Sequence, residues 1–396
     1  MRVSRAAVSK DGQGDGMTKK LRVGIVSANW GAVAHLPAWR TLCEDVEVTA
    51  ICTSRRETAE AAAQQFAVDR PFWDFEAMCA DPEIDLIDAG TNPVLREKIV
   101  TAALTAGKHV VNQMPFAASA AGARRLEALR ADQGRVGAAA ASLLGLPHLA
   151  LMKEMVEAGE IGEVLQVHCS WHLSFFLQIM PGFPYTWFGK AGLGVSVTRN
   201  HGSHMLHALR HLFGPIQSVS SHIQTMVKTW AMPDGERRAV ETDDTAHALL
   251  SFANGTMGTL TTSWVGADSP GFSLEAMGTK GRLHLTALRY PSVDSAQLYA
   301  GGNSMTLAPD GAVVPVPSRL MMVSGRPCEE EASDLLNGGQ RISLARLFST
   351  VVSGIRTGST PLPSFARAAE VQGLIEALYA ANERRAWVDT AAYLSD

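Results

Sequence analysis

This 396-residue chain has few cysteines, no long apolar run and no excess of positive charge. Its five cysteines are scattered and form no Cys-x-x-Cys pair, so their pattern favours reduced thiols over a disulfide framework or a zinc site. Such cysteine usage predicts a cytoplasmic location. No apolar run approaches the ~20 residues that a membrane-spanning helix needs, so we expect no membrane partner.

The charge balance is slightly acidic, with a net charge of −4 and a pI of about 6.3. A chain of this kind has no global basic field to attract nucleic acid, so we expect no nucleic-acid partner. Hydrophobic residues make up 46% and charged residues 19%, a composition typical of globular proteins. The length is comfortable for two domains that each bury their own core.

The first 16 residues are polar and small, include glycine, and contain no apolar core of a signal peptide. Met17, followed by Thr18-Lys19-Lys20, is a plausible alternative start to Met1. We therefore expect residues 1–20 to form a flexible tail.

From residue 21 the sequence alternates short apolar runs with longer amphipathic stretches, the pattern of a parallel sheet with right-handed crossovers. The predicted strands are 21–26, 46–52, 85–89, 109–111 and a weaker one at 137–142. The predicted helices are 32–43, 57–66, 95–106 and 119–134. This alternation ends at about residue 142.

The remaining chain has a different rhythm, in which one helix at 148–157 precedes a series of strands. The predicted strands are 216–229, 244–253, 256–266, 271–278 and 281–286. Asn254-Gly255, between two alternating runs, is a strong hairpin signal. We expect a large, mostly antiparallel sheet, a loop excursion over 302–340, and two closing helices at 342–356 and 364–384. An exposed sheet face or edge predicts a homodimer or homotetramer.

Two motifs carry a resemblance to a known family. The run from Ala106 to Pro115, which ends Asn112-Gln113-Met114-Pro115, resembles the fifth strand of the Gfo/Idh/MocA oxidoreductases, and Gly202-Ser203-His204 resembles their catalytic helix. The resemblance covers roughly residues 20–390. It implies an N-terminal Rossmann NAD(P)-binding domain over 21–142. It also implies a C-terminal α/β domain over 143–396 that binds a small-molecule substrate and forms the oligomer.

The turn after the first strand departs from the Gly-x-Gly-x-x-Gly pattern that cradles a pyrophosphate. Aligned on the family, the three glycine positions are Ser27, Asn29 and Ala32, with Trp30 and Gly31 between them. Asparagine tolerates left-handed backbone and Gly31 adds freedom, so a modified cradle can form. The alternative is a turn that binds nothing.

The end of the second strand reads Thr53-Ser54-Arg55-Arg56 and carries no acid for the ribose hydroxyls of NAD. A hydroxyl and guanidinium groups suit a 2′-phosphate, so we expect NADP(H), with NAD(H) less favoured. The alternative is a solvated helix start. We favour the phosphate because cations at a helix N-terminus are unfavourable without an anion nearby.

Two further loops belong to the cofactor site by resemblance. Thr91 and Asn92, after the fourth strand, fall in a family loop that lies along the cofactor. Gln113 and Met114 replace the first two residues of the family's Glu-Lys-Pro motif, whose lysine touches nicotinamide and substrate. A thioether has no proton to give and no charge to stabilise an alkoxide, so the acid–base chemistry here is non-standard.

On the second motif, the family's aspartate falls on Asn200, its histidine on His204 and a later aspartate on His207. His204 suits general acid–base work because imidazole titrates near neutral pH, and Asn200 can orient a hydroxyl. His204, His207 and His211 share one helical face, which also suggests a metal site. No carboxylate or cysteine lies nearby in sequence, so we favour a histidine-rich pocket and predict no metal.

Aromatic residues gather between Trp171 and Trp187, where the family places its substrate wall. Aromatic faces stack on sugars and apolar rings, although simple strand and loop packing is the better explanation for most of these residues. Tyr185 is the only hydroxyl-bearing aromatic here, so it is our candidate for a replacement acid.

Two functions follow from these patterns. The first is an NADP(H)-binding oxidoreductase that acts on a hydroxylated ring compound, which can be a sugar, a cyclic polyol or an aromatic-derived compound. The alternative is a dinucleotide-binding sensor or regulator without turnover, because Met114 and Asn200 replace polar catalytic positions.

Overall fold

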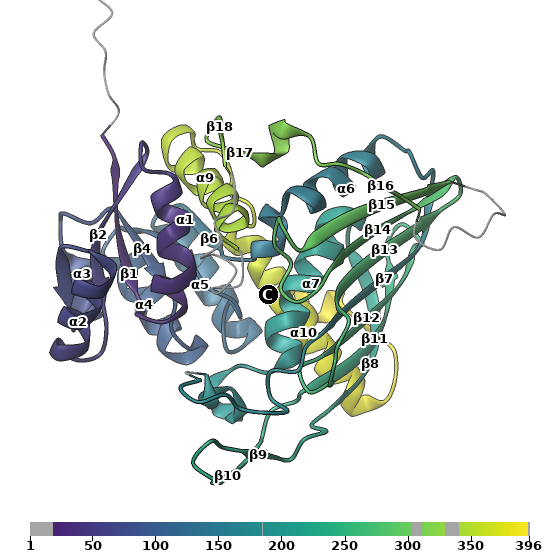
Figure 1. The fold of residues 1–396 in the computed structure, drawn as a ribbon, viewed down its shortest axis with the longest axis horizontal. Helices are drawn as coiled ribbons and strands as arrows, with labels where there is room; N and C mark the ends of the chain where they lie inside the picture. Colours follow the sequence, from purple (N-terminus) through teal and green to yellow (C-terminus); the bar gives the residue numbers. More distant parts are fainter. Residues whose placement is uncertain (1–18, 184, 303–310, 329–339, 395–396) are drawn as a thin grey trace, which may run out of the picture.

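The computed structural model describes residues 19–183, 185–302, 311–328 and 340–394. The described chain forms two large sheets at opposite ends of the molecule, with helices beside and between them, and two small two-stranded sheets (Figure 1). Most of the predicted tail (1–20) and part of the predicted loop excursion (302–340) lie outside the described residues. Within the described ranges, no helix is long and apolar enough to cross a membrane.

Six parallel strands form the first sheet, in the order β3-β2-β1-β4-β5-β6. Their bounds are β1 (Leu21–Val26), β2 (Val46–Cys52), β3 (Arg70–Phe72), β4 (Leu86–Ala89), β5 (His109–Asn112) and β6 (Gly137–Ala139). The predicted Rossmann fold is confirmed, although the pattern missed the short, half-buried β3. The strand order reverses between β1 and β4, and open parallel sheets bind ligands at such a point, outside the carboxyl ends of the strands.

Helices cover both faces of this sheet. They are η1 (Gly31–His35), α1 (Leu36–Thr41), α2 (Arg56–Phe66), α3 (Phe75–Ala80), α4 (Pro93–Thr105) and α5 (Ala120–Asp132). The helix predicted at 32–43 is divided, because its first turn is a π-helix in which the Leu36 N–H donates to the Gly31 carbonyl. Pro37 explains the division, since it has no N–H for the regular helical bond.

A buried carboxylate holds this divided helix on β4. Asp88 accepts hydrogen bonds from His35 Nδ1 at 2.9 Å and from Trp39 Nε1 at 2.6 Å, and its side chain is fully buried. Buried carboxylates need such partners, because an unpaired charge in the interior is costly. The network therefore fixes the helix that follows the turn after β1.

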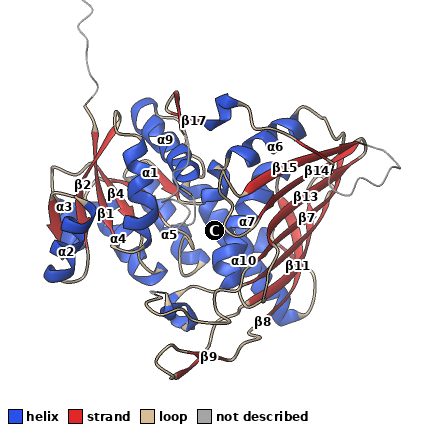
Figure 2. Cartoon of the chain, viewed as in Figure 1, coloured by secondary structure: helices blue, strands red, loops and turns tan. Residues whose placement is uncertain are grey.

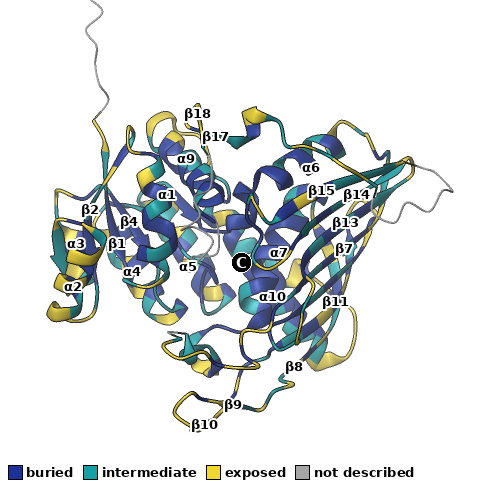
Figure 3. Ribbon diagram, viewed as in Figure 1, coloured by how far each residue is buried: buried dark blue, intermediate teal, exposed yellow. Residues whose placement is uncertain are grey.

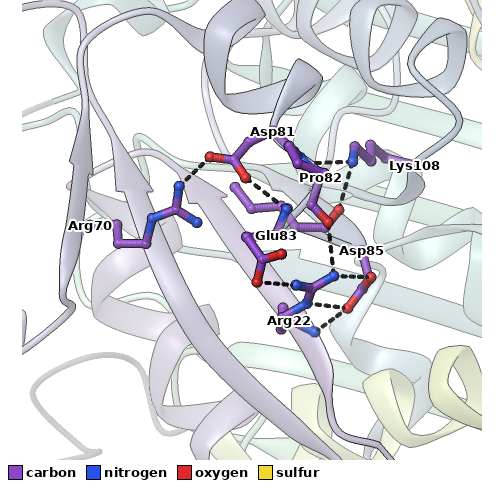
Figure 4. A network of polar contacts seen from close by, with 8 residues as sticks. Arg22, Arg70, Asp81, Pro82, Glu83, Asp85 and Lys108 are labelled. Carbon is purple, nitrogen blue, oxygen red and sulfur yellow. Dashed lines mark hydrogen bonds and ion pairs between the residues drawn. The ribbon is translucent and has the colours of Figure 1, made fainter.

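A second polar network lies at the amino ends of β1 and β4 (Figure 4). Arg22 Nη2 donates to Asp85 Oδ1 at 2.9 Å and to the Pro82 carbonyl at 2.9 Å. Lys108 Nζ donates to the carbonyls of Asp81 and Ile84, both at 2.7 Å. These bonds tie the loop before β4 to both neighbouring strands, at the edge opposite the carboxyl ends.

Nine strands form the second sheet, in the order β16-β15-β14-β13-β7-β12-β11-β8-β19. Their bounds are β7 (Val164–His172), β8 (Ile216–Gln224), β11 (Thr245–Phe252), β12 (Met257–Ser263), β13 (Gly271–Gly278), β14 (Gly281–Ala287), β15 (Ala296–Gly302), β16 (Ala312–Val313) and β19 (Val388–Asp389). All pairs are antiparallel except β7 with β12, so the predicted sheet is confirmed. The strand predicted at 216–229 ends at Gln224, and β9 (Thr229–Ala231) and β10 (Arg237–Ala239) form a separate hairpin.

The inner face of this sheet packs on helices, and its other face is open in the described structure (Figures 2 and 3). The remaining helices are η2 (Ser142–Gly145), α6 (Pro147–Glu157), η3 (Thr186–Gly189), η4 (Ala191–Leu193), α7 (Val197–Phe213), η5 (Ser318–Met321), α9 (Arg341–Thr357), α10 (Phe365–Arg384) and α11 (Ala391–Leu394). Residues alternate along the strands, so apolar side chains such as Leu165 and Met257 point outward, 48% and 69% exposed.

The C-terminal helices return to the first sheet. Trp39 of α1 stacks on Phe348 of α9 with ring centroids 4.2 Å apart, and Ser364 bridges to Ala138 of β6. Helix α10 packs on α5 as well as on β8. The two sheets are thus joined by shared helices, and the domain division at residues 142 and 143 stays a prediction.

Candidate active site

Three loops meet at the carboxyl ends of β1, β4 and β5. Gly90, at the end of β4, lies so close to the first turn that an added Cβ would sit 3.1 Å from Ser27 Cβ and 3.3 Å from Gly31 Cα. Glycine is therefore required for this close approach, which brings the turn after β1 against the loop after β4. The sequence placed cofactor-binding residues on the same two loops.

The turn after β1 presents an uncapped helix start. The Asn29 N–H donates to Ser27 Oγ at 3.2 Å, and Trp30 begins the helix without a side-chain capping bond. The first N–H groups of a helix have no intrahelical acceptor and attract anions. Gly31 packs tightly, since a Cβ there would lie 3.0 Å from Ile25 Cγ2. These donors fit a dinucleotide pyrophosphate.

The end of β2 exposes Ser54, Arg55 and Arg56 to solvent. The Arg56 guanidinium is engaged, because Nε donates to Glu60 at 2.8 Å and the group lies 5.2 Å from the centre of the Trp73 ring. Arg55 is the residue before α2 and has no side-chain partner within the described ranges. Of the two arginines, Arg55 is thus the one available to a ligand.

A buried arginine joins the second and third loops. Arg96 of α4 donates to the carbonyls of Thr91 and Pro115, and burial lowers the pKa of its guanidinium to about 9. It is still a cation at neutral pH. Asn92 Oδ1 accepts from the Leu95 N–H at 3.0 Å and caps α4. The predicted roles of Thr91 and Asn92 toward a cofactor remain predictions.

Met114 lies in the third loop and is 6% exposed. Its N–H donates to Gln113 Oε1 at 2.7 Å, which folds that half-buried side chain back on the loop. Asn112 Nδ2 donates to the Phe116 carbonyl at 2.8 Å and ties the loop to the end of β5. The position of the family's lysine is therefore occupied by an apolar, mostly buried side chain.

Helix α7 begins at a well-defined point. Ser196 Oγ accepts from the Arg199 N–H at 3.2 Å, and Asp243 accepts from Thr198 Oγ1 at 2.6 Å and from the Tyr379 hydroxyl at 2.6 Å. A carboxylate at a helix N-terminus is favourable because of the helix dipole. These bonds fix α7 against α10 and β11.

The histidines of α7 form its buried face. His201 stacks on Trp171 with ring centroids 4.2 Å apart, and His204 meets the edge of the same ring at 6.0 Å. Burial lowers the pKa of His201 to about 3 and that of His204 to about 4. Both rings are therefore neutral at pH 7, and His204 retains 9% exposure. The predicted base is thus placed beside the aromatic wall.

Tyr290, in the loop after β14, belongs to the same cluster, and the sequence patterns missed it. Its ring lies 5.2 Å from Trp171 and 6.0 Å from His201. It also lies 6.2 Å from Trp30, so it connects the second sheet to the turn after β1. Burial, together with the neighbouring Tyr185 phenol, raises the pKa of Tyr290. No motif surrounds it, so only the fold could reveal it.

Tyr185, the predicted replacement acid, lies at the edge of this cluster. Its ring contacts Phe183, Trp187 and Phe188, and burial raises its pKa to about 12. It has no ring contact with either histidine among the described residues. Tyr290 is closer to the histidines and is the stronger candidate for a phenol at the site.

The fold therefore brings together several of the predicted residues. The turn at 27–31, the loop at 91–92 and the loop at 113–114 converge at one edge of the first sheet. His204 lies in the aromatic cluster that reaches this edge through Trp30. The half-buried Asn200 makes no side-chain hydrogen bond to any described residue and is free to meet a ligand. Residues 54–56 lie further out, at the end of β2.

No metal site emerges from the histidines. Within the described part of the chain, no group of three or more histidine, cysteine, aspartate or glutamate side chains is arranged to hold a metal ion. The histidines His201 and His204 of α7 instead pack against the ring of Trp171.

Comparisons with known proteins add two family matches. Residues 21–140 match the oxidoreductase family with an NAD-binding Rossmann fold, and residues 149–284 match the GFO/IDH/MocA C-terminal domain. Levoglucosan dehydrogenase of Pseudarthrobacter phenanthrenivorans is 24% identical over 61% of this chain and 67% of its own length. D-apiose dehydrogenase of Paraburkholderia graminis is 23% identical over 68% of each chain.

Solved structures show the same fold. An NAD-binding oxidoreductase from Klebsiella pneumoniae superimposes with a TM-score of 0.79, at 23% identity, over 94% of this chain and 99% of its own. Levoglucosan dehydrogenase in complex with NADH superimposes with a TM-score of 0.82, at 21% identity, over the same shares. At this identity the likeness concerns the fold alone.

Proposed function

The chain belongs to the Gfo/Idh/MocA family of NAD(P)-dependent oxidoreductases, and from this premise we propose that it oxidises or reduces a hydroxylated ring compound with NADP(H). The observation that carries the proposal is the position of His204. It lies on a buried helix face beside the aromatic cluster, and that cluster reaches the cofactor edge through the contact of Tyr290 with Trp30.

The nicotinamide ring, when bound, supplies the hydride acceptor or donor. The turn at 27–31 would hold the pyrophosphate at its free N–H groups, and the loops at 91–92 and 113–114 would line the nicotinamide end. His204 would take the proton of the substrate hydroxyl through Nε2. That nitrogen is the accessible one, because Nδ1 is buried and has no partner among the described residues.

Asn200 lies one helical turn before His204, so both side chains share a face of α7. Its carboxamide can orient a hydroxyl but cannot accept the proton. A phenol of Tyr290 or Tyr185 can add a hydrogen bond to the substrate oxygen. Met114 adds no charge at the position of the family's lysine, so His204 would accept the proton without that cation beside it.

Charge at the end of β2 supports NADP(H) over NAD(H). Arg55 has a free guanidinium and Ser54 a free hydroxyl, and neither has a carboxylate beside it in sequence before Glu57. Guanidinium groups bind phosphate through charge-assisted bonds. Arg56 instead pairs with Glu60, so it offers a matched control.

Titration calorimetry of the two dinucleotides tests this assignment. We expect NADP+ to bind more tightly than NAD+, and Arg55→Ala to raise the Kd for NADP+ about tenfold or more, because it removes a charged phosphate contact. Arg56→Ala should change the Kd by less. Equal Kd values for the two dinucleotides would contradict the assignment. So would a lower Kd for NAD+ that is unchanged by Arg55→Ala.

The substrate class follows from the wall around His204. Phe175 is exposed and stacks on the half-buried Tyr290, and such aromatic rings stack on sugars, cyclic polyols and aromatic-derived compounds. The names of relatives agree with this range, since they include a levoglucosan, a D-apiose and a scyllo-inositol dehydrogenase.

Turnover on a panel of levoglucosan, D-apiose, scyllo-inositol and aromatic cis-dihydrodiols tests the enzymatic function. We expect NADP+-dependent oxidation of at least one class, and His204→Ala should lower kcat by about a hundredfold or more with unchanged NADP+ affinity, because it removes the base. An absence of turnover on every class, with tight NADP+ binding retained, would instead favour a sensor without catalysis.

We also propose a homo-oligomer, with the open face of the second sheet as its interface. This face has outward apolar side chains, including the half-exposed Leu165 and Leu249. A second copy would cover them. Light scattering on the full chain measures the assembly, and a monomeric mass over a wide concentration range would exclude it.

A further inference from the structure

Three histidines lie in a row along one face of α7. His204, His207 and His211 are spaced by three and then four residues, which places them above one another on a helix. His207, in the middle, is only 1% exposed, whereas His211 is half-buried at the C-terminal end of the helix. The row therefore runs from the aromatic cluster through the interior toward solvent.

Three ring nitrogens of this row have no hydrogen-bond partner among the described residues. Nδ1 of His204 and both nitrogens of His207 are buried and make no hydrogen bond to any described residue. Buried polar atoms are nearly always paired, with protein or with ordered water. We therefore expect ordered water at both nitrogens of this buried imidazole.

The far end of the row is in a polar, accessible setting. The charged groups near His211 are Lys153 and Glu157 of α6 and Arg367 of α10. The pKa of His207 is lowered mainly by burial. The nearby rings of His204 and His211 and the guanidinium of Arg367 lower it further. The three imidazoles are therefore neighbours in space as well as in sequence.

Oxidation of an alcohol at this site has a difficulty that the row would solve. The reaction releases a proton, and His204 is a poor place to keep it because burial lowers its pKa to about 4. Met114 offers no cation to stabilise an alkoxide. If the imidazole releases a proton from its second nitrogen as the first nitrogen accepts one, it remains neutral. It then carries no positive charge in the interior, where such a charge is costly.

We propose that His207 relays the substrate proton from His204 to His211, with ordered water between the rings, so that α7 is the proton exit of the site. This proposal rests on the proposed function for its hydride acceptor. His207 is a relay residue that touches neither substrate nor cofactor.

The relay consists of proton transfers only. The substrate O–H bond breaks as its proton bonds to Nε2 of His204, and the proton on Nδ1 leaves toward His207. His207 accepts that proton on one nitrogen and releases another from its second nitrogen toward His211, which gives one to bulk water. Each ring ends neutral in the opposite tautomer, the hydride is carried by the cofactor as NADPH, and the carbonyl product and one proton in solvent complete the balance. The rings return to their starting tautomers by exchanging protons with the ordered water before the next turnover.

A crystal structure of the NADP+ complex, at a resolution that places waters, tests the pathway without any substrate. We expect water molecules bonded to His204 Nδ1 and to both nitrogens of His207. The proposal would be overturned if no water molecule contacts these nitrogens, or if protein groups are bonded to both nitrogens of His207. This outcome is independent of whether the panel yields turnover.

Kinetics tests the role, with whichever of levoglucosan, scyllo-inositol or D-apiose is turned over fastest. We expect His207→Phe and His207→Gln both to lower kcat about tenfold or more at nearly constant KM, because neither side chain can change tautomer as imidazole does. The solvent deuterium isotope effect on kcat should rise in both. Gln keeps hydrogen bonding, so a merely structural role for His207 would be rescued by it.

His148→Phe is the matched control. His148 is another buried histidine with an unpartnered Nδ1, and burial alone lowers its pKa to about 4, so it is not electrostatically coupled to the row. We expect its kcat and solvent isotope effect to equal those of the unmodified protein. Full activity in His207→Gln, or an unchanged isotope effect in His207→Phe, would overturn the relay.

Discussion

The carboxylate of Asp243 fixes the start of α7, and the geometry of the candidate active site depends on it. It accepts from Thr198 and from Tyr379, which ties the first turn of α7 to α10. Once this end is fixed, the helical repeat sets the positions of His201, His204 and His207 against the second sheet. The stack of His201 on Trp171 then aligns that face with the aromatic cluster.

The second constraint is the absence of charge around His204. Its pKa is lowered by burial alone, and its ring meets the edge of Trp171, which in turn contacts His201 and Tyr290. In such a setting a developing charge is poorly solvated, so under the proposed function we expect proton movement to be coupled closely to hydride transfer. The replacements at Met114 and Asn200 are consistent with each other, because both remove charge from the same region.

Much of this fold could be predicted from the sequence, because periodicity reports directly on buried strands and helices. The strands at 21–26, 46–52 and 271–278 were predicted with their observed bounds. The division of the first helix was missed, since it depends on the absent N–H of Pro37. The short β3 was missed because three half-buried residues carry no periodic signal.

The site was predicted less completely than the fold. His204 and the turn at 27–31 could be found by motif, because local sequence carries them. Tyr290 could not, since its importance comes from contacts with Trp171 and Trp30, more than a hundred residues away in sequence. The different environments of Arg55 and Arg56 likewise depend on Trp73 and Glu60, and a motif does not distinguish them.

The central claim is that Met114 and Asn200 belong to a neutral acid–base arrangement organised around His204. The most direct measurement is the turnover of the preferred substrate by the double variant Met114→Lys with Asn200→Asp. A lysine would supply an alkoxide-stabilising interaction typically worth roughly a few kcal/mol, but into a pocket arranged without charge. We expect no gain in kcat/KM on that substrate. A large gain would contradict the claim, because it would show that the two replacements are losses within the usual mechanism.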